Sequence, residues 1–111
     1  MIELREYVDP HGQSPFARSF TGLNAPAAAR VTVALTRLEA GNTASLKAVG
    51  AGVAELRLDF GPGYRVYLGQ DGETLVILLA GGTKKQQQRD IDTAKHRWLD
   101  YKRRKKEEGS L

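Results

Sequence analysis

The stretch that decides the fold runs from residue 55 to residue 67 and reads Glu55-Leu56-Arg57-Leu58-Asp59-Phe60-Gly61-Pro62-Gly63-Tyr64-Arg65-Val66-Tyr67. Apolar and polar residues alternate on both sides of the Gly-Pro-Gly triplet, which is the period of a strand with one buried face. Glycine and proline make the triplet itself a turn. The stretch therefore predicts a β-hairpin with one apolar and one polar face.

The polar face of this hairpin is the first candidate site. With a turn of only three residues, Asp59 opposes Arg65 and Arg57 opposes Tyr67, and opposed residues point to the same side of a sheet. The face then gathers Glu55, Arg57, Asp59, Arg65 and Tyr67. Two interpretations stay open. One is a phosphate-binding patch, because a guanidinium matches two phosphate oxygens. The other is a solvated surface with an Asp59–Arg65 ion pair.

Local signals place the other elements around the hairpin. Upstream we expect a strand over residues 2–8, a short helix that begins at Ser14-Pro15 and ends at Gly22, a helix over 25–40 and a loop over 42–52. Downstream we expect a strand over 73–80, apolar at both parities, and a helix over 84–105. Residues 107–111 should form a frayed tail.

These elements predict an α+β fold in one domain over residues 1–106. The element order is β-α-α-β-β-β-α, with a three- to four-stranded, mainly antiparallel sheet and the helices packed on one face. A chain of 111 residues, 41% of them hydrophobic, suits a single small core. There is no cysteine, no secretion signal and no apolar run long enough to span a membrane, so we expect a cytoplasmic protein.

The positive charge is concentrated near the C-terminus. Residues 1–83 hold 7 Lys or Arg and 8 Asp or Glu, whereas residues 84–111 hold 10 Lys or Arg and 5 Asp or Glu. Such a field attracts nucleic acid, although a solvated basic helix would have the same composition. The two histidines, His11 and His96, are not spaced as metal ligands, and no cofactor or metal is expected.

Several segments together resemble toxins of the RelE/ParE superfamily, most closely the HigB-like or phage-derived addiction-module killer proteins. The similarity covers residues 53–101. It is carried by the hairpin, by Leu75-Val76-Ile77-Leu78-Leu79, and by Gly81, Gly82, Lys84, Gln87, Asp90, Ile91, Ala94, Trp98 and Tyr101. The resemblance implies the RelE-like fold and the toxin of a type II toxin–antitoxin module. It further implies an endoribonuclease that cleaves mRNA on the ribosome, through attack of the RNA 2′-hydroxyl on the adjacent phosphate.

The resemblance also assigns residues and partners. Arg65 and Arg57 correspond to the family's catalytic basic positions, and Lys84 and Lys85 to those at the last strand–helix junction. RNA contacts are expected from Lys47, Tyr67, Arg89, Lys95, Lys102 and Arg103. The implied partners are a cognate antitoxin of the helix-turn-helix type, the ribosome and mRNA, with operator DNA reached only through the antitoxin. Two alternatives remain: a ParE-like gyrase inhibitor, and a degenerate toxin that only binds its antitoxin and represses the operon.

Overall fold

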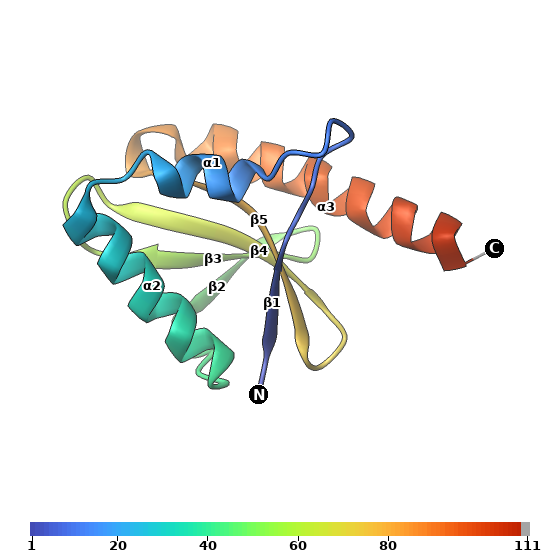
Figure 1. Ribbon diagram of the computed structural model, residues 1–111, viewed down its shortest axis with the longest axis horizontal. Coiled ribbons are helices and arrows are strands. Elements are labelled where there is room, and N and C mark those ends of the chain that lie inside the picture. Colours follow the sequence, from blue (N-terminus) through green and yellow to red (C-terminus); the bar gives the residue numbers. More distant parts are fainter. Residues whose placement is uncertain (110–111) are drawn as a thin grey trace.

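Nine elements follow one another along residues 1–109, which the computed structural model describes (Figure 1). They are β1 (Glu3–Glu6), α1 (Pro15–Thr21), α2 (Ala25–Glu39), β2 (Leu46–Gly50), β3 (Val53–Leu58), β4 (Tyr64–Asp71), β5 (Leu75–Thr83), the 3₁₀ helix η1 (Lys84–Gln86) and α3 (Gln87–Gly109). The predicted α+β class is therefore confirmed.

The first two helices begin and end where the capping signals predicted. The Ser14 Oγ accepts a hydrogen bond of 3.0 Å from the Ala17 N–H, with proline at the first helical position of α1. The Asn24 Oδ1 likewise accepts from the Ala27 N–H at 2.9 Å at the start of α2. Gly41, with a φ of +96°, follows α2 in the left-handed conformation that stops a helix.

The sheet has five strands in the order β1-β5-β4-β3-β2, which corrects the expectation of three or four. β1 pairs with β5 in parallel, and the other neighbours are antiparallel. The additional strand is β2, which lies inside the segment 42–52 that we expected to be a loop. Gly50, Ala51 and Gly52 all have positive φ values, so they fold β2 back onto β3 in a tight turn.

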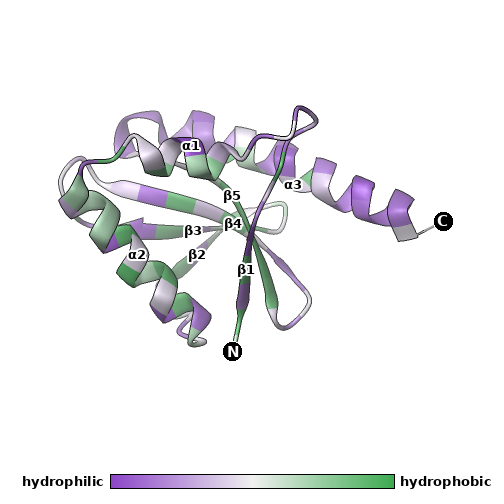
Figure 2. Cartoon of the chain, in the orientation of Figure 1, coloured by the Kyte–Doolittle hydropathy of each residue, from purple (hydrophilic) through white to green (hydrophobic). Residues whose placement is uncertain are grey.

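Helices cover both faces of the sheet, so the prediction that they pack on one face is wrong. α1 and α2 contribute Phe16, Val31 and Leu38 to the core on one face, and α3 contributes Ile91, Ala94 and Trp98 to the core on the other. The reason lies in β5, whose residues 76–79 are apolar at both parities and buried on both sides. Figure 2 shows this pattern, with hydrophobic colour on the central strands and hydrophilic colour on the far half of α3.

The hairpin register differs from the predicted one by two residues. Arg57 lies opposite Arg65, and Glu55 lies opposite Tyr67. The turn is wider than three residues because Phe60 leaves the ladder and its ring packs 5.9 Å from the ring of Tyr64. Since side chains alternate with a period of two, a shift of two residues keeps the predicted faces intact.

The last helix is longer than predicted. α3 continues through residues 107–109, which we expected to be frayed, while residues 110 and 111 of that expected tail lie outside the described residues. Its far half projects beyond the sheet, as Figure 1 shows. None of the helices within residues 1–109 is long and apolar enough to cross a membrane.

Candidate functional site

Two neighbouring rows of charged side chains lie on the face of the sheet that α3 covers. In one row Arg57 of β3 stands directly opposite Arg65 of β4. In the next row Lys47 of β2 stands opposite Glu55 of β3. Opposed residues share a face, so the ladder collects three cations around one carboxylate. The corrected register thus brings Arg57 and Arg65 closer together than the predicted one did.

Arg65 is the buried member of this group, with only 4% of its surface exposed. Its Nη1 donates a hydrogen bond of 2.8 Å to the carbonyl oxygen of Gly63. Its Nε lies 3.6 Å from the Glu55 Oε1 and has no hydrogen-bond acceptor among residues 1–109. A buried guanidinium with an unsatisfied N–H retains the capacity to bind an anion oxygen.

Glu55 connects the site to α3. Its carboxylate is 1% exposed, and its Oε1 lies 3.9 Å from the Nε of Arg57, whose side chain is 45% exposed. Its Oε2 accepts a hydrogen bond of 2.8 Å from the side-chain amide of Gln87, in the first turn of α3. Sequence reasoning placed Glu55 on the polar face but assigned it no role. A charged residue alternating within an otherwise buried strand was the available signal.

Tyr67 does not lie where RNA could reach it. Its side chain is fully buried in the α3-side core, because β4 is the central strand and α3 lies over it. The expected contact between Tyr67 and RNA is therefore corrected. Burial, together with the nearby Glu55 carboxylate, raises the pKa of Tyr67 to about 12, so the phenol stays protonated at neutral pH. Its hydroxyl finds no hydrogen-bond partner in the described part of the chain.

Lys84 stands beside the hairpin turn. Its backbone N–H donates to the Pro62 carbonyl at 3.4 Å. A Cβ added to Gly63 would lie 3.1 Å from the Arg65 Nη1 and 3.3 Å from the Lys84 Cβ, so the three residues are close neighbours. Lys85 is exposed in the same 3₁₀ turn. Both lysines are thus exposed, and the backbone of Lys84 lies against the hairpin turn beside Arg65.

The other expected RNA contacts lie along α3. A Cβ added to Gly50 would lie 3.2 Å from the Lys95 Nζ, which puts Lys95 at the end of β2. Lys102, two turns further, lies with its Nζ 5.6 Å from the Trp98 ring centroid. Arg89 is exposed near the start of α3. Arg103 forms ion pairs with Asp100 at 2.5 Å and Glu107 at 3.5 Å, so its charge is largely compensated.

The arrangement supplies cations without a histidine or a metal site. His11 lies exposed in a turn before α1 and His96 lies exposed on α3, both away from the arginine pair. No group of three or more His, Cys, Asp or Glu within residues 1–109 could hold a metal ion. What the site can do is neutralise and orient an anion such as a phosphate through Arg57, Arg65 and Lys84.

Comparison with known proteins gives a family for this chain. Residues 18–99 match the family described as phage-derived protein Gp49-like (DUF891). An uncharacterised protein of Haemophilus influenzae (strain ATCC 51907 / DSM 11121 / KW20 / Rd) is 47% identical over 72 residues, which is 65% of this chain and 73% of that relative. The matched region contains the hairpin, β5 and most of α3. The chain therefore belongs to the Gp49-like family of phage-derived proteins, a toxin-like family of addiction modules.

Proposed function

We propose that this protein is the toxin of a type II toxin–antitoxin module and acts in the cytoplasm as a ribosome-dependent mRNA endonuclease. The proposal takes the family membership one step further, to the RelE/ParE superfamily. The single observation that carries it is the Arg57–Arg65 pair, with the unsatisfied Nε of buried Arg65. Two like charges directly opposite each other are unfavourable in a sheet unless an anion compensates them.

In the resting protein that anion is the carboxylate of Glu55. It lies near the Nε of both arginines, so it holds them in place and lowers the cost of burying Arg65. An RNA phosphate would be a second anion for the same cations. Arg57 is the more exposed of the two, so it would meet the phosphate first, and Lys84 would join from η1.

The chemistry would be an internal transfer within the RNA. The 2′-hydroxyl attacks the adjacent phosphorus and gives up its proton to solvent water, the bond to the 5′-oxygen breaks, and that oxygen takes a proton from water. A cyclic phosphate and a free 5′-hydroxyl result. Charge on the phosphate rises in the transition state, and fixed cations in a partly buried site stabilise that charge. Arg65 would supply most of this stabilisation, while Arg57 and Lys84 hold the substrate.

Because Arg65 is only 4% exposed, binding requires a local rearrangement. The segment to move is η1 with Gln87, which lies against the hairpin turn through Lys84 and against Glu55 through its amide. The basic side chains of α3, Lys95 and Lys102 among them, would draw the protein toward ribosomal RNA. A cognate antitoxin would neutralise it.

Translation-coupled mRNA cleavage tests the proposal. The wild-type protein should generate new mRNA 5′ ends on translated transcripts, mapped by primer extension. Arg65→Ala should lower the cleavage rate by about 100-fold or more, the usual effect of removing a transition-state donor. Arg18→Ala, an exposed arginine of α1, is the matched control and should cleave normally. Intact transcripts with folded wild-type protein would disprove the proposal.

One observation favours a second function. The near-complete burial of Arg65 beside Glu55 is also what a purely structural ion pair requires. In that case the toxin would act without phosphate chemistry, as a gyrase inhibitor. Expression would then induce the DNA-damage response and leave mRNA intact, and Arg65→Ala would change toxicity only through stability.

A further inference from the structure

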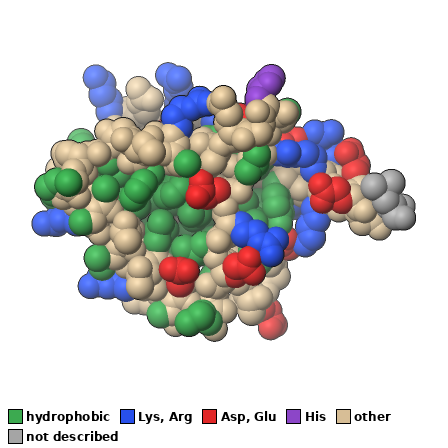
Figure 3. Space-filling view, in the orientation of Figure 1, with side chains coloured by type: hydrophobic (Ala, Val, Ile, Leu, Met, Phe, Trp, Pro, Cys, Tyr) green, Lys and Arg blue, Asp and Glu red, His purple; other side chains and the backbone are tan. Residues whose placement is uncertain are grey.

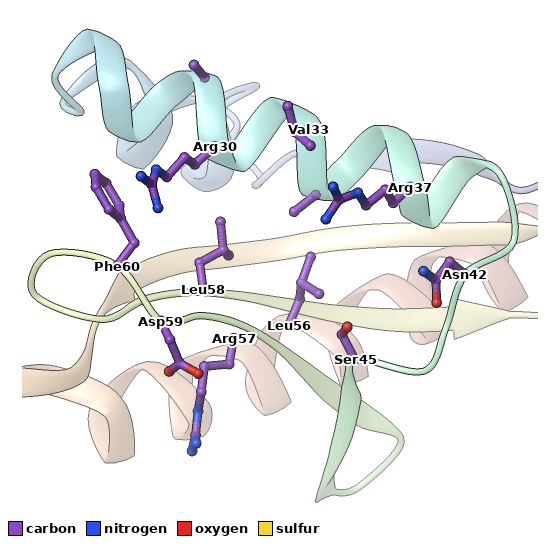
Figure 4. Close-up of a pocket in the computed structure, with 12 residues that line it drawn as sticks. Arg30, Val33, Arg37, Asn42, Ser45, Leu56, Arg57, Leu58, Asp59 and Phe60 are labelled. Carbon is purple, nitrogen blue, oxygen red and sulfur yellow. The ribbon is translucent and has the colours of Figure 1, made fainter.

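A groove of about 470 Å³ runs between α2 and β3, on the face of the sheet opposite α3 (Figure 4). Leu56 and Leu58 point up from β3 toward α2 and form its floor. Val33 of α2 faces it and is 49% exposed, which is high for a large aliphatic side chain. Leu56 is almost fully buried and Leu58 is half-buried, so the apolar surface that the groove leaves open is mainly that of Val33 and Leu58, and polar side chains surround it.

Two arginines of α2 flank this floor. Arg30 and Arg37 are seven residues apart, so they project from nearly the same side of the helix at a separation of about 10 Å along its axis. The Arg30 guanidinium lies 4.0 Å from the centroid of the Phe60 ring. Neither arginine forms an ion pair with any residue between 1 and 109. Arg57 of β3 and Asp59, which follows that strand, also line the groove, and their side chains extend away from α2 (Figure 4).

A second apolar hollow lies on the other side of α2 and makes the charge difference clear. It is framed by α1, α2 and β1, has a volume of about 370 Å³ and carries the carboxylates of Glu6 and Glu39. Figure 3 shows hydrophobic side chains gathered in this part of the surface. The two hollows differ in charge: three arginines, Arg30, Arg37 and Arg57, and one carboxylate, Asp59, line the groove, whereas the charged residues that line the second hollow are Glu6 and Glu39. An acidic ligand should therefore bind the groove with Arg30 and Arg37 in preference to the second hollow.

We propose that the α2–β3 groove docks an acidic amphipathic helix of a partner polypeptide. Apolar side chains on one face of that helix, at positions i, i+3 or i+4 and i+7, would cover Val33 and Leu58. Two carboxylates about two turns apart on the flank would pair with Arg30 and Arg37. Charge complementarity requires the partner helix to be negatively charged, and the apolar floor of the groove requires apolar side chains on the helix face that lies against it.

Other occupants fit less well. Single-stranded RNA needs aromatic rings to stack its bases on, and the one ring at this groove, Phe60, is already covered by Arg30. A second copy of the chain would bring Arg30 and Arg37 toward a protein with a net charge of +4. The docking site is also separate from the arginine pair on the α3 face, so it does not depend on whether the protein cleaves RNA.

The test uses the full-length protein and two labelled helical peptides of about 15 residues. Both carry the same leucine stripe. One has two glutamates two turns apart on its flank, and the other has two lysines there. Fluorescence anisotropy gives the affinities, and methyl chemical shifts locate the binding. We expect the glutamate peptide to bind at least tenfold more tightly than the lysine peptide, to weaken with salt, and to shift Leu56, Leu58 and Val33.

Charge reversal completes the test. R30E/R37E should bind the glutamate peptide at least tenfold more weakly and should gain affinity for the lysine peptide. R5E/R18E changes the net charge equally on exposed arginines outside the groove and should bind like the wild type. Equal binding of the two peptides, shifts located elsewhere, or no binding of either would overturn the inference. Displacement of the peptide by single-stranded RNA at equal concentration, or self-association through the groove, would overturn it as well.

Discussion

The two faces of the sheet bury the same central strands in different ways. The α1–α2 face carries an apolar cluster built around Phe16, Leu38 and Leu68. The α3 face buries Tyr67 within its apolar cluster and also buries Glu55 and Arg65. Among residues 1–109, Tyr67 and Arg65 each have a polar atom without a hydrogen-bond partner. Buried unsatisfied groups lower stability, and they concentrate at functional sites. The contrast is what the proposed function requires, a face that binds an anion at some cost in stability.

The largest effect should come from removing the carboxylate of that face. Glu55→Ala leaves Arg65 buried without its anion, so the free energy of unfolding should fall by about 3–5 kcal/mol in urea titrations. The double variant E55L/R65M removes both charges and should recover most of this loss while remaining inactive. A loss below about 1 kcal/mol in Glu55→Ala would show that the pair is not effectively buried.

A somewhat smaller effect is expected where α3 approaches β4 most closely. A Cβ on Gly69 would overlap ring carbons of Trp98, closer than atoms can come. Gly69→Ala should therefore displace the ring and cost about 2–3 kcal/mol. Since Trp98 is the single tryptophan of the chain, its fluorescence should shift to longer wavelength.

Gly72→Ala provides the comparison for that experiment. A Cβ at Gly72 would meet nothing within 4 Å, although its φ of +75° strains any other residue. We expect a loss of about 1 kcal/mol and an unchanged emission maximum. If Gly69→Ala behaved in the same way, the close packing of Trp98 on β4 would be refuted.

On the α1–α2 face, the Asn24 side chain that caps α2 should affect stability and leave activity unchanged. Asn24→Ala removes the side-chain oxygen that accepts from the Ala27 N–H, so the free energy of unfolding should fall by about 1 kcal/mol. Activity per folded molecule should not change, because α2 lies across the sheet from the arginine pair. Asn24→Ser, which can still cap, is the control. A fall in activity per folded molecule would contradict the assignment of activity to the α3 face alone.

The smallest effect concerns the link between the β4–β5 turn and the far half of α3. Hydrogen bonds from the Lys105 ammonium and the Tyr101 hydroxyl lower the pKa of Asp71 from its ordinary value of 3.8. A lowered pKa in the folded state means that the stabilisation is present above pH 3.8 and is lost as the pH falls through the folded-state value.

Asp71→Asn should therefore be less stable than the wild type by up to about 1 kcal/mol at pH 7, since the pair is at the surface. The difference should shrink as the pH falls below 3.8. Urea unfolding across that range measures it. A difference that stays constant with pH would mean that the Asp71 charge does not stabilise the fold.

Some of this organisation follows from local sequence signals. Ser14, Asn24 and Gly41 set helix ends through contacts within a few residues, so the ends of α1 and α2 were predictable. The alternation in residues 55–67 determined which side chains share a face, because a strand has a period of two whatever its partner. For the candidate site, this placed Arg57 and Arg65 together and left the identity of their neighbours open.

The remainder required the tertiary structure. The apolar residues of β5 pointed to burial on both faces, yet only the packing of α3 against Ile77 and Leu79 showed which helix covers the second face. The pairing partner of Glu55 depended on how far Phe60 left the ladder, which is decided by its contacts with Arg30 and Tyr64. Likewise, Tyr67 has the position of a polar-face residue in the sequence, but it is buried by α3, a helix that begins 20 residues further along the chain. Local sequence determines the period and the ends of elements, whereas burial and charge pairing arise between segments distant in sequence.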